Sequence, residues 1–111
     1  MKKKKVKLTE LIPTQIFLTK ETPDFFEKSG VPNGYPQIWD IEGRLMIADG
    51  HHRLYYLLMM GIDELTVECF DYHEYKGNAG AEWIPEELIK QANQCQTESI
   101  TSLLDLKGRI V

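Results

Sequence analysis

Apolar residues recur with two periods along this 111-residue chain, and each period predicts one type of element. Short apolar or alternating runs are typical of strands. Gly43 lies between two such runs, and a glycine there supplies the backbone angles of a tight hairpin turn, Glu42-Gly43-Arg44. The predicted strands occupy residues 6–8, 16–19, 38–41, 45–48 and 64–71.

Helical spacing marks other parts of the chain. The leucines within residues 51–60 fall on one side of a helix, and Gly61 is typical of the residue that follows one. Strands and helices alternate unevenly, which indicates an α+β fold. Two further helices are predicted, over 22–30 after Thr22-Pro23 and from Pro85 to Gln96, with a short helical turn within 100–111.

Composition and charge describe an ordinary soluble domain over residues 1–111. Hydrophobic residues make up 42% of the chain, charged residues make up 27%, and the net charge of −4 does not favour nucleic acid over other partners. Lys2, Lys3, Lys4 and Lys5 form a local basic run. This run is either a solvated, frayed N-terminus or a contact for DNA or phosphate.

The N-terminal lysines have no apolar segment behind them, which argues against a secretory signal peptide. No apolar stretch approaches the roughly 18 residues that a membrane span needs. Two cysteines do not make a disulfide framework, so a reducing compartment is favoured. We therefore expect a cytoplasmic protein that has no membrane contact.

The densest polar stretch is Asp49-Gly50-His51-His52-Arg53, directly after an apolar run. Adjacent histidines on a helix point about 100° apart. Histidines that share a metal ion on one helix instead stand three or four residues apart. The spacing therefore argues against a zinc site at His51 and His52.

The same stretch fits a phosphate cradle. A predicted strand leads into Gly50, which lets the backbone approach an anion, and a helix begins at His51 with exposed N–H groups. Arg53 and the histidines add donors. Asp49 repels a phosphate unless a cation lies between them, or the carboxylate serves as a base or a helix cap. The alternative is an ordinary turn that Asp49 caps.

Several residues outside this stretch have two interpretations each. Trp39 and Trp83 are either core packing or surfaces for base stacking. His73 is either polar surface or a residue that flanks the site. Cys69 is expected to be buried in a strand, whereas Cys95, near the end of a polar helix, is expected to be more exposed.

The order of these parts resembles the ParB/sulfiredoxin superfamily. After "KLTELIPTQIFLT", the segment "RLMIADGHHRLYYLLMMGIDELTVECFD" contains a strand, a G-x-[HR]-R box at a helix start, a glycine and a further strand. The resemblance covers residues 6–71, and the helical part over 84–111 carries no motif of the family. It implies a single ParB/sulfiredoxin-like domain with a small mixed sheet and helices packed around it.

Members of this superfamily hold the phosphates of CTP, ATP or ADP at this box, usually with Mg²⁺. The resemblance therefore implies that Gly50, His51, His52 and Arg53 bind phosphate. His51 stands where sulfiredoxin has a catalytic cysteine and partition-type ParB has a glutamate, which argues against reductase chemistry. The Asp-Gly-His-His-Arg form is closest to the branch that contains the archaeal free-serine kinase.

In that branch an acid from the early segment activates the acceptor hydroxyl. Glu21 matches this acid by position, with Glu10 as the other candidate. The catalytic residues that the resemblance implies are therefore Glu21, Asp49 and His52. Mg²⁺ would be bound through the nucleotide, with Asp49 as its protein contact.

We accordingly predict a nucleotide-binding domain that performs Mg²⁺-dependent phosphoryl transfer to a small-molecule hydroxyl, or nucleotide hydrolysis. It would be a kinase or an NTPase. One alternative is a non-catalytic, DNA-associated ParB-like module in which Lys2 to Lys5 contact the DNA backbone. The other is a ParB-like nuclease, for which the sequence offers no metal-ligand cluster.

Overall fold

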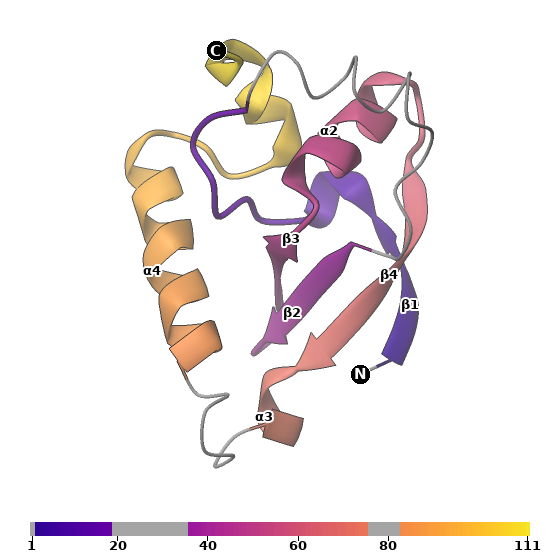
Figure 1. Cartoon of the computed structure of the whole chain (residues 1–111), viewed down its shortest axis with the longest axis vertical. Helices are drawn as coiled ribbons and strands as arrows, with labels where there is room; N and C mark the ends of the chain where they lie inside the picture. Colours follow the sequence, from indigo (N-terminus) through magenta and orange to yellow (C-terminus); the bar gives the residue numbers. More distant parts are fainter. Residues whose placement is uncertain (1, 19–35, 76–82) are drawn as a thin grey trace.

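A four-stranded mixed sheet forms the centre of the computed structural model, which describes residues 2–18, 36–75 and 83–111 (Figure 1). Its strand order is β1-β4-β2-β3, with antiparallel pairs at both edges and the parallel pair β4–β2 between them. The strands are β1 Lys2–Lys7, β2 Gln37–Ile41, β3 Arg44–Asp49 and β4 Glu64–Asp71. The helical elements are η1 Leu8–Glu10, α2 His51–Met59, α3 Tyr72–Tyr75, α4 Trp83–Thr97 and η2 Leu103–Arg109. This arrangement confirms the α+β fold with a small mixed sheet and helices packed around it.

The β2–β3 hairpin forms where the sequence predicts it. Glu42 and Gly43 have positive φ angles of 53° and 86°, so they make a two-residue turn whose twist matches that of the paired strands. The Asp40 carboxylate accepts the Gly43 N–H at 2.9 Å. Arg44 belongs to β3, so the turn is one residue shorter than the predicted one.

The helix α2 ends at the predicted glycine. Gly61 has a φ angle of 91°, which a residue with a side chain rarely adopts. Its N–H donates to the Leu58 carbonyl at 3.0 Å, and the Ile62 N–H donates to the Leu57 carbonyl at 3.0 Å. These two bonds satisfy carbonyls that the helix would otherwise leave without partners.

Alternate residues of β2 and β3 contribute to two cores on opposite faces of the sheet. Ile38 and Ile47 are fully buried against α2 and η2, whereas Trp39 and Met46 are buried with residues of α4. Trp39 also stacks on Phe70, with ring centroids 5.4 Å apart. The core-packing interpretation of Trp39 is therefore confirmed.

The strand β1 is longer than the sequence pattern predicts. The backbone from Lys2 to Lys7 pairs with β4, so the expectation of a frayed N-terminus is wrong. The lysine side chains nevertheless remain exposed, while Val6 is buried. An edge strand tolerates this pattern because pairing orders the backbone while the charged heads stay in water. Leu8, which the prediction placed in the strand, begins η1.

The helix α4 presents Leu88, Ala92 and Cys95 to the interior. Cys95 follows Ala92 by three residues and Leu88 by seven, so all three fall on one helix face. Cys95 is fully buried, and the expectation that it is the more exposed cysteine is therefore wrong. Cys69 is buried, as expected.

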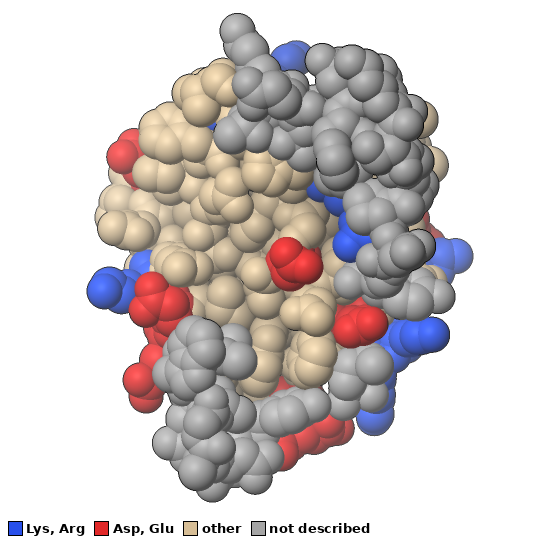
Figure 2. Space-filling model, in the orientation of Figure 1, with Lys and Arg blue, Asp and Glu red and all other residues tan. Residues whose placement is uncertain are grey.

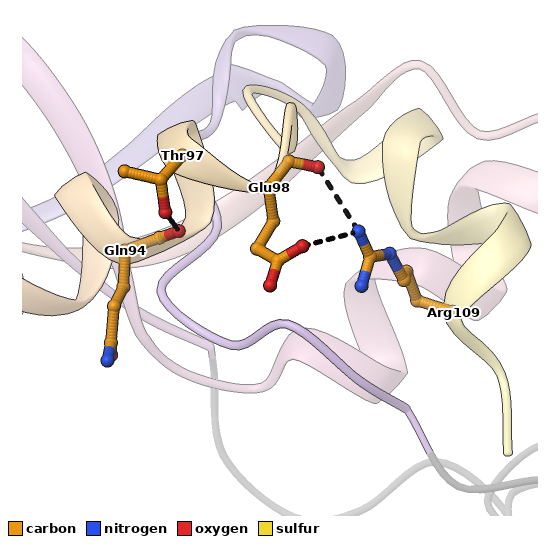
Figure 3. A network of polar contacts seen from close by, with 4 residues as sticks. All are labelled: Gln94, Thr97, Glu98 and Arg109. Atoms are coloured by element: carbon orange, nitrogen blue, oxygen red, sulfur yellow. Dashed lines mark hydrogen bonds and ion pairs between the residues drawn. The ribbon is translucent and has the colours of Figure 1, made fainter.

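The element η2 confirms the short helical turn predicted near the end of the chain. Arg109 donates to the Glu98 carboxylate at 3.0 Å and to the Glu98 carbonyl at 3.2 Å, which joins η2 to the end of α4 (Figure 3). Leu18 forms an isolated bridge with Ile110. Within the described residues, this bridge is all that remains of the strand predicted over 16–19.

Some predictions fall on residues that are not described. They concern Glu21, the helix over 22–30 and the side chain of Trp83. Among the described helices, none combines the length and the apolar character that crossing a membrane requires.

Candidate functional site

The candidate site is the turn between β3 and α2. Asp49 is the last residue of β3, Gly50 has a φ angle of 100°, and α2 begins at His51. Gly50 therefore occupies the cap position of α2, and the alternative in which Asp49 caps the helix is wrong. The first hydrogen bond of the helix runs from the Leu54 N–H to the Gly50 carbonyl at 2.9 Å. The N–H groups before Leu54 point out of the helix start, where an anion is favoured.

One side of Gly50 is closed by Pro36. The φ angle favours glycine at position 50, and an added Cβ atom would lie 3.1 Å from the Cβ of Pro36, so that Pro36 would have to shift by a few tenths of an ångström. Pro36 is itself buried, and its carbonyl accepts the Glu68 N–H at 2.9 Å. The turn is therefore packed against a fixed point of the sheet.

The other side of the turn is held by His51. The His51 side chain is 6% exposed, and its Nε2 accepts the backbone N–H of Thr14 at 2.9 Å. Because an amide N–H can only donate, Nε2 is the unprotonated nitrogen and the neutral ring carries its proton on Nδ1. His51 is therefore an acceptor toward Thr14.

Burial keeps this ring neutral. It lowers the pKa of His51 from its ordinary 6.5 to about 4, because the charged ring would lose its hydration, and the neighbouring His52 lowers this pKa further. Burial also lowers the pKa of His52, whose side chain is half-buried. Arg53, also half-buried, is therefore the residue that gives the box positive charge at neutral pH.

Thr14 belongs to this site although the sequence pattern does not indicate it, and the same is true of Pro36. The Oγ1 of Thr14 donates to the Ile47 carbonyl at 2.6 Å and lies 3.3 Å from His51 Nε2. The preceding segment bridges β3 at Ile12, whose carbonyl accepts the Ile47 N–H at 3.0 Å. Thr14 is 37 positions from His51, and no local pattern connects the two.

Of the remaining predicted residues, Asp49 lies at this turn, and Glu10 and His73 lie elsewhere. Asp49 is exposed at the turn, and Glu10 is exposed at the end of η1. His73 follows β4, which runs parallel to β2 and therefore opposite to β3. It consequently lies at the other end of the sheet from the box, and the interpretation of His73 as a flanking residue is wrong. Within the three described ranges, no group of three His, Cys, Asp or Glu side chains could hold a metal ion.

A hollow of about 330 Å³ lies at that other end of the sheet. It has lysines of β1 on one side and carboxylates of β2, β4 and α3 on the other. Its lining residues are Lys2, Lys3, Lys4, Asp40, Cys69, Asp71 and Glu74.

Comparison with known proteins defines the fold but not the activity. No family model and no curated protein matches the chain. Among solved structures, the crystal structure of protein Atu1540 from Agrobacterium tumefaciens superposes with a TM-score of 0.62 at 16% sequence identity. The match covers 96% of this chain and 61% of that chain, so this chain spans about three fifths of the length of Atu1540. Similarity at this level of identity shows a shared fold, and the ParB/sulfiredoxin resemblance stays a prediction.

Proposed function

We propose that this domain binds the phosphate groups of a nucleotide at the β3–α2 turn. The observation that carries the proposal is the left-handed Gly50, which is followed at once by the start of α2 with Arg53 in its first turn. Main-chain N–H groups, the helix dipole and a guanidinium then act on one anion. The resemblance of the box to the phosphate-binding motif of the ParB/sulfiredoxin superfamily supports the same function.

The residues divide the work by their chemistry. Arg53 supplies the positive charge and two parallel donors, and the left-handed φ angle of Gly50 sets the direction in which the start of α2 faces the anion. His52 is half-buried, and a neutral ring there offers a donor for a phosphate oxygen. Asp49 is exposed beside the turn, where its carboxylate suits Mg²⁺ that arrives with the nucleotide. Mg²⁺ would neutralise phosphate charge.

The reaction we propose is phosphoryl transfer to a small-molecule hydroxyl, or hydrolysis of the nucleotide. Both are assisted by a group that orients the attacking oxygen, and a carboxylate suits that role. Glu21 remains our candidate for that role on the resemblance alone. The nucleotide is ATP, ADP or CTP.

Calorimetric titration of the full chain with ATP, ADP and CTP, with and without Mg²⁺, tests this proposal. We expect at least one nucleotide to bind, and Arg53→Ala to weaken binding about tenfold or more, because a charge-assisted hydrogen bond contributes about 1.5–3 kcal/mol. Arg44→Ala is the matched control, since Arg44 is exposed at the opposite end of β3. Failure of every nucleotide to bind, or an Arg53→Ala variant that binds like the control, would overturn the proposal.

A second candidate function is contact with nucleic acid through β1. The observation in its favour is that Lys2 to Lys5 stand exposed on an edge strand, and Figure 2 shows basic side chains along the margin where Figure 1 places β1. Glu64 and Glu68 face this strand from β4, opposite Lys7 and Lys3. These carboxylates offset the basic charge, so we favour the nucleotide site.

A further inference from the structure

We propose that His51 is a positioning residue, which together with Thr14 forms a buried latch that fixes the β3–α2 turn, rather than a residue that contacts phosphate. This inference rests on the proposed nucleotide site and assigns a different role to one residue of its box. It also brings into the site the segment over residues 12–14, to which neither the sequence pattern nor the resemblance assigned a function.

One ring nitrogen of His51 already has a hydrogen-bond partner. Nε2 of His51 is the acceptor of the Thr14 N–H at 2.9 Å, and the ring is almost wholly enclosed. A ring nitrogen that accepts from an amide has no proton to give to a phosphate oxygen. The remaining ring proton, on Nδ1, belongs to a side chain that is only 6% exposed, so we assign the contribution of His51 to its contact with Thr14.

Thr14 is attached to β3 as well as to His51. Its hydroxyl donates to the carbonyl of Ile47 in β3, and the bridge at Ile12 ties the preceding backbone to the same strand. Thr14 thus contacts the chain on both sides of Gly50: Ile47 precedes the glycine and His51 follows it. A short, rigid segment therefore spans the turn.

This latch would control the direction in which α2 begins. The direction in which the first N–H groups of α2 point depends on how the helix leaves Gly50. Pro36 and the Thr14–His51 contact both limit that geometry. Without the imidazole, the Thr14 N–H would be buried with no acceptor, which favours a rearranged turn.

Two substitutions separate positioning from direct contact. His51→Gln keeps an acceptor oxygen at about the reach of Nε2, whereas His51→Leu fills similar space without an acceptor. We expect His51→Leu to weaken ATP binding about tenfold or more, and His51→Gln to bind within about threefold of the wild type. Amide hydrogen exchange at Thr14 should be slow in the wild type and in His51→Gln, and faster in His51→Leu. A His51→Gln variant that loses as much affinity as His51→Leu would overturn the proposal.

A measurement on the wild type does not depend on whether either variant folds. Nitrogen NMR of the His51 ring should show the proton on Nδ1, both without a nucleotide and with saturating ATP and Mg²⁺. A proton on Nε2 in the presence of ATP would overturn the latch. If no nucleotide binds, the proposed function fails, while Thr14 exchange and the tautomer still report whether the latch exists. The two failures are therefore distinguishable.

Discussion

The β3–α2 turn and the strand β1 both contain dense runs of charged or polar residues, but the fold treats them in opposite ways. At the turn, His51 and Thr14 are buried and hydrogen-bonded to each other. Along β1, Lys5 pairs with Glu64 at 3.4 Å while its side chain stays 70% exposed. A buried polar group determines the conformation around it, because losing its partner is costly, whereas an exposed ion pair contributes little.

The β3–α2 turn and the strand β1 therefore differ in the functions that their residues can perform. The turn has a single geometry that a Cβ atom at position 50 or a charge on His51 would disturb. In the described part of the chain, β1 is an edge strand that pairs with β4 alone. Its exposed lysines discourage another chain from adding to that edge. Specific recognition is thus expected at the turn, and protection of the edge at β1.

The largest effect that we expect at the turn is a pH dependence of stability. The folded-state pKa of His51 lies at about 4, below its ordinary 6.5, so the unfolded chain binds the extra proton between these values. The contribution of His51 is fully present above pH 6.5 and is lost as the pH falls toward 4. At about 1.4 kcal/mol for each unit of pKa, the loss is about 3 kcal/mol.

Urea unfolding of the wild type and of His51→Gln at pH 7, 5.5 and 4 measures this loss. Other titrating groups are common to both proteins, so the difference between the two curves isolates His51. We expect the wild type to lose stability relative to the variant as the pH falls. Parallel curves would mean that the ring is not buried as a neutral acceptor.

The next effect compares two glycines with similar backbone angles. Gly50 and Gly61 have φ angles of 100° and 91°, but an added Cβ would press on Pro36 only at position 50. We expect Gly61→Ala to lower the free energy of unfolding by about 1 kcal/mol and Gly50→Ala to lower it by about 2 kcal/mol or more. Urea midpoints measure both. Equal losses would show that the close approach of Pro36 has no energetic consequence.

Local signals explain which parts of this fold could be predicted. The hairpin turn at Gly43 and the helix end at Gly61 depend on residues next to one another, and the strand over 64–71 was predicted with its observed bounds. The sequence pattern predicts too short a strand at β1, because a run of lysines has little strand propensity of its own. Pairing with β4, some 60 positions away, supplies the missing stability.

At the candidate site, too, the residues that a local pattern marks could be predicted, and the residues that long-range contacts bring in could not. The sequence located Gly50 and Arg53 because a strand, a glycine and a helix start follow one another directly. It did not reveal Thr14 or Pro36, whose contacts with the box cross 37 and 14 positions respectively. From the sequence alone His51 is predicted to be a donor, because no local pattern indicates that the distant Thr14 amide occupies its Nε2.

The smallest effect is expected at β1. Lys5→Thr removes an exposed ion pair and introduces a residue that suits a strand, so we expect the free energy of unfolding to change by less than about 0.5 kcal/mol. Replacing all of Lys2–Lys5 with threonine extends the test to binding. Fluorescence anisotropy with a labelled DNA duplex, at low and moderate salt, should show weak binding with the same salt slope before and after the replacement.

The opposite outcome would reverse the comparison between the two regions. An affinity that falls steeply with salt in the wild type, and no longer does so after the replacement, would support the DNA-associated module instead. Light scattering gives a second readout, because a neutral edge strand offers its N–H and C=O groups to another copy of the chain. We expect the replaced protein to self-associate more than the wild type. Glu64 and Glu68 reduce the net positive charge that a phosphate backbone would meet, which is why we expect only weak DNA binding. The exposed lysines still keep other strands away from this edge, which is why we expect their replacement to increase self-association.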